Sequence, residues 1–260
     1  MSSRIFALDF DGVLCDSARE TAHTAWRAGA ALGERWTPEQ PPEAYVDRFL
    51  RIRPVLETGY QAIPLMRLAV QEVPVEDVLK NPDSYLEESI RQTGRTASEL
   101  KDALATTRDR WIRDNFSDWI AHHRFYPGTI EALQRALTHD RVYILTTKQE
   151  KFADALLEYA GVKIPPDNLY GLESGEPKET TLTRLLSHNG VEADALHFVE
   201  DRLPTLERTL HPPELDGMHR YLAAWGYNTA DIQQRASRIA GIETLYLEDF
   251  CSLLKQRTTA

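Results

Sequence analysis

The chain has 260 residues, 42% of them hydrophobic, which is enough for one large globular domain or two modest ones. Its formal net charge of −10 argues against a nucleic-acid-binding protein, because such a surface needs clustered lysine and arginine. A small phosphorylated substrate is compatible with this charge, since a single positive pocket can lie in an acidic protein.

The cysteines and the apolar runs indicate the compartment. The chain contains only Cys15 and Cys251, too few for a disulfide framework, so we expect reduced thiols and a cytoplasmic protein. No apolar run approaches the roughly 18 residues that cross a bilayer, and the N-terminus lacks a signal-peptide pattern. We therefore expect no membrane partner, and the sequence leaves the oligomeric state open.

The predicted elements begin with an apolar strand over Arg4–Phe10. The segment that follows, residues 17–124, shows no comparable strand pattern. Helices are predicted at Ser17–Gly33, Pro41–Glu57 and Gln61–Glu72, and the capping box Thr96-Ala97-Ser98-Glu99 opens a long helix toward Phe116. A proline-rich patch at Pro38–Pro42 is interpreted as a loop. We expect residues 17–124 to form a separate all-helical domain.

From the turn Phe125-Tyr126-Pro127-Gly128 onward, strands and helices alternate. The strand-like runs are Arg141–Thr146, Leu196–Val199, Tyr221–Trp225 and Glu243–Leu247, and the helical ones are Thr129–Leu137, Gln149–Ala160, Glu179–Asn189 and Thr229–Ala240. Such alternation favours right-handed crossovers and a mostly parallel sheet. The sequence thus predicts an α/β protein: a Rossmann-like core of residues 1–16 and 125–260, with the all-helical domain 17–124 inserted.

Two carboxylates stand at the end of the first strand, in Asp9-Phe10-Asp11-Gly12. Residues two apart in a strand share a face, so Asp9 and Asp11 repel each other unless a cation or a shared proton intervenes. The carboxyl end of a strand is where a parallel α/β sheet keeps its chemistry. The alternative interpretation is an Asx turn that closes an ordinary strand.

Polar residues also follow the later strands. Thr146-Thr147 ends one strand, Glu200-Asp201 ends another, and Lys178 opens a helix between them. Each has a simpler interpretation: a helix cap, a solvated lysine, or acids that interact with a helix dipole. The carboxyl ends of parallel strands meet at one edge, so we expect these residues to gather around Asp9.

With these residues the chain resembles the haloacid dehalogenase-like (HAD) hydrolase superfamily. Asp9-x-Asp11-Gly12, the strand ending at Thr146, Lys178 and Glu200-Asp201 are similar to its four signatures. The helical insertion resembles the cap of the subclass that includes phosphoglycolate phosphatase and β-phosphoglucomutase, in which the cap lies between signatures one and two. The resemblance implies that dehalogenases of the family lack an acid at the place of Asp11, and that phosphonate-cleaving members usually lack one too.

The chemistry expected at this edge is phosphoryl transfer. Asp9 is the candidate nucleophile, Asp11 the candidate acid and base, and Thr146, Thr147 and the backbone at Gly12 the candidate phosphate ligands. Lys178 would hold both the phosphate and Asp9. Mg²⁺ is the expected cofactor, with Asp9, the carbonyl of Asp11 and Asp201 as ligands and Glu200 as a further acid. Two positions depart from the family pattern: Thr147 stands where asparagine is common, and Thr205 where a further acid is common.

The helical insertion offers candidate contacts to the leaving group. Arg48 and Arg51 lie three residues apart on a predicted helix and could bind an anionic or polyhydroxylated group. A solvated charged face is an equal alternative. We expect a phosphatase acting on a small phosphorylated metabolite, because a cap leaves little room for a macromolecule. The alternatives are a phosphomutase with the same aspartate pair and a non-catalytic binding protein that kept the fold.

Overall fold

The structure is a computed structural model that describes residues 4–37 and 39–256. Pro38 of the proline-rich patch, and residues 1–3 and 257–260 of the predicted core domain, lie outside the described residues. The chain divides into two compact units: Met1–Asp16 with Phe125–Ala260, and Ser17–Arg124. Among the described residues, none of the helices combines the length and the apolar character that crossing a bilayer requires.

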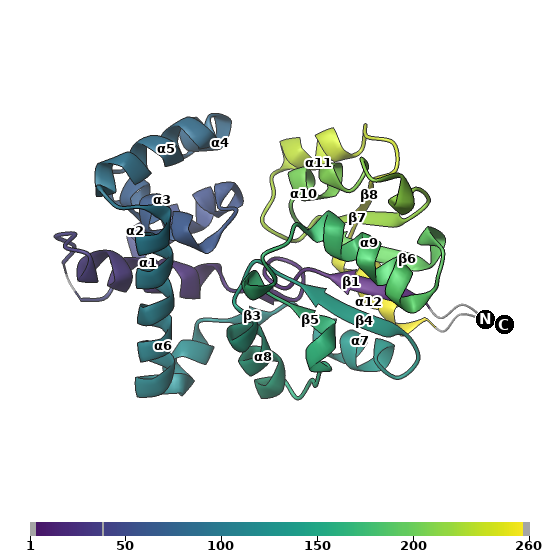
Figure 1. Ribbon diagram of the computed structural model, residues 1–260. Helices are drawn as coiled ribbons and strands as arrows, with labels where there is room; N and C mark the ends of the chain where they lie inside the picture. Colours follow the sequence, from purple (N-terminus) through teal and green to yellow (C-terminus); the bar gives the residue numbers. More distant parts are fainter. Residues whose placement is uncertain (1–3, 38, 257–260) are drawn as a thin grey trace. The chain divides into compact units, whose positions relative to one another are not determined.

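A parallel six-stranded sheet forms the centre of the first unit, in the order β5-β4-β1-β6-β7-β8 (Figure 1). Its strands are β1 (Ile5–Leu8), β4 (Arg141–Leu145), β5 (Leu169–Tyr170), β6 (Leu196–Glu200), β7 (His219–Ala223) and β8 (Glu243–Leu245). Leu8, the last residue of β1, lies opposite both Ile144 of β4 and Val199 of β6. The carboxyl ends of these three strands are therefore neighbours.

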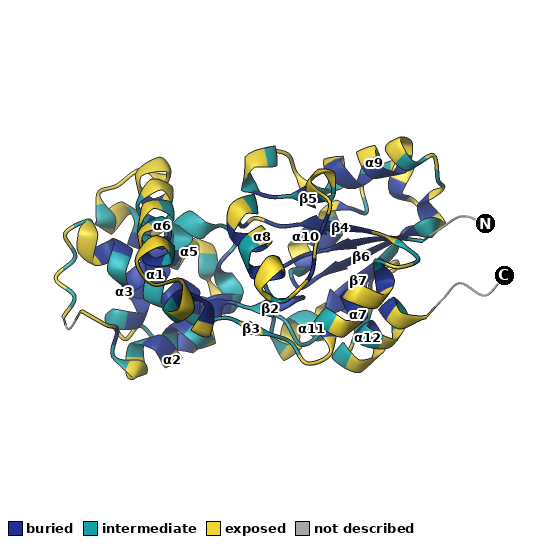
Figure 2. Cartoon of the chain, turned by 90° about the horizontal axis from the view of Figure 1, so that it is seen from below, coloured by how far each residue is buried: buried dark blue, intermediate teal, exposed yellow. Residues whose placement is uncertain are grey.

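Helices flank this sheet, and its central strands β4, β1, β6 and β7 are mostly buried (Figure 2). The helices are α7 (Thr129–Ala136), α8 (Glu150–Tyr159), α9 (Lys178–Asn189), α10 (Leu203–Arg208), α11 (Ala230–Ala236) and α12 (Leu247–Lys255). Ile5 and Ala7, on one face of β1, belong to an apolar cluster with α9 and α10, which includes Leu182 and Leu206. This architecture confirms the predicted α/β class with a mostly parallel sheet.

The second unit is built from helices. They are α1 (Ala18–Ala31), α2 (Glu43–Ile52), α3 (Ala62–Val70), α4 (Val75–Lys80), α5 (Pro82–Thr93) and α6 (Ala97–Ala121). Trp26, Phe49 and Met66 lie in its apolar core. Where the chain passes between the units, the short strands β2 (Cys15–Asp16) and β3 (Arg124–Phe125) pair with each other. These six helices confirm the helical character predicted for the insertion, while its bounds, 17–124, stay a prediction.

Several element bounds differ from the prediction. The expected helix Pro41–Glu57 ends at Ile52, because Pro54 lacks the N–H that an α-helix needs. The chain continues there as a 3₁₀ turn. The helix opened by Thr96 continues to Ala121 across non-helical backbone at Asn115. The prediction missed the short strands β2, β3 and β5 and the helices α4, α5, α10 and α12, and it made α11 too long. Of these helices, α4 and α10 are short, whereas α5 and α12 are amphipathic helices of ordinary length.

Candidate active site

The turn after β1 brings a carboxylate and a glycine to the sheet edge. Asp9 is buried, and its N–H continues the strand pairing by donating to the Val199 carbonyl (2.9 Å). Gly12 follows in a left-handed conformation with φ of +89°. A Cβ at this position would lie 2.1 Å from Oδ2 of Asp201, so glycine is what allows Asp201 to approach the turn.

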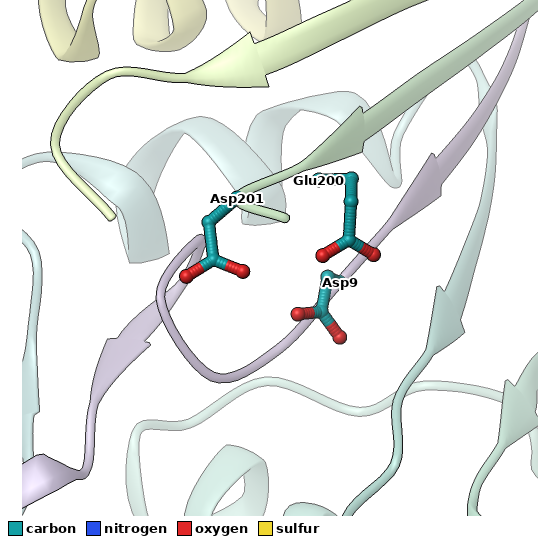
Figure 3. A group of neighbouring side chains, drawn as sticks. All are labelled: Asp9, Glu200 and Asp201. Carbon is teal, nitrogen blue, oxygen red and sulfur yellow. The ribbon is translucent and has the colours of Figure 1, made fainter. Parts of the chain in front are cut away.

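Three buried carboxylates converge at this edge. Asp9 follows β1, Glu200 is the last residue of β6, and Asp201 follows it, and all three are at least nine-tenths buried. One oxygen from each lies within 4.8 Å of the others. Figure 3 shows the Glu200 and Asp9 carboxylates facing each other, with Asp201 beside them. Parallel pairing of β1 with β6 makes this clustering unavoidable, since both strands end at the same edge.

Lys178, the first residue of α9, is the positive charge in this cluster. Its Nζ donates to Oδ1 of Asp9 (2.8 Å) and to Oε2 of Glu200 (2.7 Å). The other Glu200 oxygen accepts from the Arg202 N–H (3.0 Å). Glu200 is thus the second partner of Lys178, while Thr205, at the position where an acid is common, is buried and accepts from Arg208.

The ammonium does not neutralise the cluster. Burial raises the pKa of Asp9 to about 7; Lys178 opposes this rise, and Glu200 adds to it. Burial alone would lower the pKa of Lys178, but Asp9 and Glu200 outweigh it and hold that pKa above its ordinary value. Carboxylate oxygens with excess negative charge suit a hard divalent cation such as Mg²⁺. Asp9, Glu200 and Asp201 therefore fit a metal of this kind.

The loop after β4 forms one wall beside Lys178. The Thr146 N–H donates to the Tyr170 carbonyl (2.9 Å), and its hydroxyl accepts from the Lys148 N–H (3.1 Å). Thr146, Thr147 and Lys178 line a cavity of about 210 Å³. Glu176 lines the same cavity, and phosphate binding by Thr146 and Thr147 stays a prediction.

A comparison with protein families bears on this constellation. The sequence model of the family described as haloacid dehalogenase-like hydrolase matches residues 4–207, more than half of the chain. This chain belongs to that family. The aspartates, Thr146, Lys178 and Asp201 of this HAD-like hydrolase all lie within the matched segment.

Solved structures share the fold of this HAD-like hydrolase across nearly its whole length. A predicted phosphatase from Clostridium acetobutylicum has a TM-score of 0.62 at 11% identity and covers 98% of this chain and 99% of its own. A predicted phosphoglycolate phosphatase from Haemophilus somnus 129pt has a TM-score of 0.62 at 16% identity, with 98% of each chain covered. A hydrolase from Pseudomonas syringae has a TM-score of 0.59 at 15% identity, with 97% of each covered. No curated protein matches the sequence.

The two cap arginines belong to the second unit of the HAD-like hydrolase. Arg48 Nη2 donates to the Val73 carbonyl (2.7 Å). Arg51 pairs with Glu76 at 3.4 Å, and both side chains are more than half exposed. Both arginines thus have partners inside their own unit, and their contact with a substrate stays a prediction.

Sequence reasoning missed the loop after β7, which supports Asp201. The Tyr227 N–H donates to Asp201 Oδ2 (2.7 Å), and Asn228 Nδ2 donates to the Asp201 carbonyl (3.1 Å). A Cβ on Gly226 would lie 2.3 Å from Cβ of Asp201. The signal was the glycine at the end of the run Tyr221–Trp225, beside the strand that carries Asp201. Lys148 was missed too, although it follows Thr146-Thr147 directly.

Proposed function

We propose that this hydrolase is a Mg²⁺-dependent phosphatase that acts on a small phosphorylated metabolite through an aspartyl-phosphate at Asp9. The observation that carries the proposal is the convergence of Asp9, Asp201 and Lys178, from three separate segments, on one buried edge. Asp11 favours cleavage of a C–O–P ester, because it supplies an acid two residues from the nucleophile.

The chain's own residues account for both halves of the reaction. An Asp9 oxygen forms a bond to phosphorus as the ester oxygen leaves, and Asp11 gives that oxygen its proton. A water molecule then attacks phosphorus, gives a proton back to Asp11, and displaces the Asp9 oxygen. Thr146 and Thr147 would bind the phosphate oxygens, while Lys178 holds Asp9 in line. The N–H of Gly12, a predicted phosphate ligand, already donates to the Cys15 carbonyl (2.9 Å).

A metal would be held by Asp9, the Asp11 carbonyl and Asp201, with Glu200 beside them. When bound, Mg²⁺ would offset the repulsion between the anionic phosphate and the attacking carboxylate. The cytoplasmic location stays a prediction from the cysteine content of the sequence, and neither Cys15 nor Cys251 is in a disulfide.

The test is a screen of the purified protein against a panel of phosphorylated metabolites, with MgCl₂ and with EDTA. We expect magnesium-dependent release of inorganic phosphate from at least one ester, and Asp9→Asn should abolish this release while the protein stays folded. Isomerised product without phosphate release would instead indicate a phosphomutase. No turnover on the whole panel would contradict the proposal and favour a binding protein.

A further inference from the structure

The site contains a second buried lysine that the proposed chemistry has not used. The Lys148 side chain is 3% exposed, and its Nζ lies 3.3 Å from Oδ1 of Asp11, whose side chain is 18% exposed. Burying an ammonium is costly unless an anionic partner is held close by. Asp11 is the carboxylate that provides this partner, as Asp9 and Glu200 do for Lys178.

The backbone around Lys148 is fixed by the neighbouring loop. Its N–H donates to the Thr146 hydroxyl (3.1 Å), and its carbonyl accepts from the Leu172 N–H (2.9 Å). A Cβ on Gly171 would lie 2.8 Å from that carbonyl, so glycine permits the two loops to touch. Glu150 adds a hydrogen bond between the same two loops, because its Oε1 accepts from the Gly171 N–H (3.0 Å).

The two lysines thus divide the work at the site. Lys178 contacts Asp9 and Glu200, whereas Lys148 contacts Asp11 from the loop after β4. An aspartate that transfers a proton must be held at the leaving oxygen, since displacement of a catalytic group by about 1 Å can cost roughly 100-fold in rate. The ion pair with Lys148, which lies on a fixed loop, restricts where the Asp11 side chain can move.

We propose that Lys148 is a positioning residue that holds the Asp11 carboxyl where it serves the leaving oxygen. The inference rests on the proposed phosphatase function. It concerns the placement of Asp11 and assigns Lys148 no contact with the phosphate. The two roles make different predictions for esters whose leaving groups differ in their need for a proton.

The experiment compares p-nitrophenyl phosphate with the alkyl phosphate that the wild type hydrolyses best. A nitrophenolate leaves without a proton, whereas an alkoxide needs one. The ratio kcat/KM depends only on the steps up to the first irreversible one, which here is the transfer of the phosphoryl group to Asp9 with loss of the alcohol. Asp11→Asn sets the pattern expected when the proton donor is lost, and Lys151→Met, at an exposed lysine three residues further on, is the matched control.

For Lys148→Met we expect kcat/KM on the alkyl phosphate to fall roughly 10- to 100-fold, while kcat/KM on p-nitrophenyl phosphate changes no more than about threefold. Asp11→Asn should show the same contrast, and Lys151→Met neither change. If Lys148→Met does not fold, Lys148→Gln, which keeps a hydrogen-bond donor without the charge, should show the contrast.

An equal loss on both esters would overturn the proposal, because it would mean that Lys148 binds the phosphate or supports the fold. Unchanged or increased activity on the alkyl phosphate would overturn it too. A failure of the proposed function is seen elsewhere: the wild type itself would hydrolyse neither ester, or Asp9→Asn would retain activity. The two failures are therefore distinguishable.

Discussion

Gly12 shows how a single residue sets the geometry of the site. Its φ of +89° and the 2.1 Å that would separate an added Cβ from Asp201 Oδ2 are separate constraints. The first concerns the backbone of the turn, and the second the space that Asp201 occupies. A side chain at this position would push Asp201 away from Asp9.

We expect Gly12→Ala to lower kcat/KM by about 100-fold, because the added Cβ would lie 2.1 Å from Oδ2 of Asp201 and force that side chain to shift. Gly217→Ala is the matched control, since Gly217 has φ of +88° with nothing within 4 Å of an added Cβ. Steady-state kinetics of both variants check the prediction. Similar losses in the two would assign the effect to backbone strain instead.

His197 is a second residue whose surroundings affect the protein, here through the burial of its ring. On β6 its ring stacks on that of His219 of β7, with centroids 4.4 Å apart. Burial lowers the pKa of His197 to about 4, and the neighbouring His219 contributes to this lowering. The folded protein therefore resists protonation of this ring.

The sign of the pH effect follows from linkage. Unfolded histidine takes up its proton near pH 6.5, while the folded His197 does so only near pH 4, so stability falls as the pH drops through this window. At about 1.4 kcal/mol per pKa unit, the cost approaches roughly 3 kcal/mol at pH 4. Urea unfolding at pH 7 and pH 4.5 should show a smaller loss for His197→Phe than for the wild type. An equal loss in both would contradict the prediction.

At the scale of elements, an ion pair joins α1 to α6. Glu20 is fully buried, and its carboxylate accepts hydrogen bonds from Arg108 Nε (2.7 Å) and Nη2 (2.9 Å). Trp119, beyond the non-helical residue Asn115, donates its Nε1 to the same carboxylate (3.1 Å). Glu20, near the start of α1, therefore contacts α6 both before and after the non-helical residue Asn115.

Removing one partner of this pair should cost more than removing both. We expect Arg108→Met to lower the free energy of unfolding by about 3–5 kcal/mol, because it leaves the Glu20 carboxylate buried and undercompensated. The double variant Glu20→Leu with Arg108→Met should recover part of that loss. Denaturant unfolding of the three proteins measures both effects, and a double variant less stable than Arg108→Met would contradict the interpretation.

At the scale of the whole molecule, a metal would join segments that are distant in the chain. Asp9 and Asp201 lie almost two hundred residues apart, yet their carboxylates share one small volume only in the folded chain. A ligand that binds only the native state stabilises it in proportion to the logarithm of its concentration. Binding of a metal at this site would thus be coupled to folding.

We expect MgCl₂ at a hundred times its Kd to stabilise the wild type by about 2.7 kcal/mol and to raise its Tm. Asp201→Asn should remove most of this increase, whereas Asp194→Asn, at an exposed acid, should retain it. Thermal melts with MgCl₂ or EDTA measure the difference. An increase of equal size in all three proteins would place the magnesium elsewhere.

Local signals in the sequence determined the element types and the α/β class. The capping box at Thr96, the apolar strand runs and the glycines that stop α8 and α9 act within a few residues of themselves, so they are legible without the fold. The strand-end rule likewise placed Asp9, Thr146 and Asp201 at one edge of the sheet. Short strands such as β5 could not be predicted, because two residues show no periodicity.

Only the tertiary structure decided which residues meet. The pairing of β6 with β1 turned Glu200 toward Lys178, and the contact between the loops after β4 and β5 set Lys148 beside Asp11. The approach of Asp201 to Gly12 and Gly226 also depends on segments far apart in the chain. Such contacts arise from strand order and loop packing, which long-range burial and charge select and which no local stretch of sequence encodes.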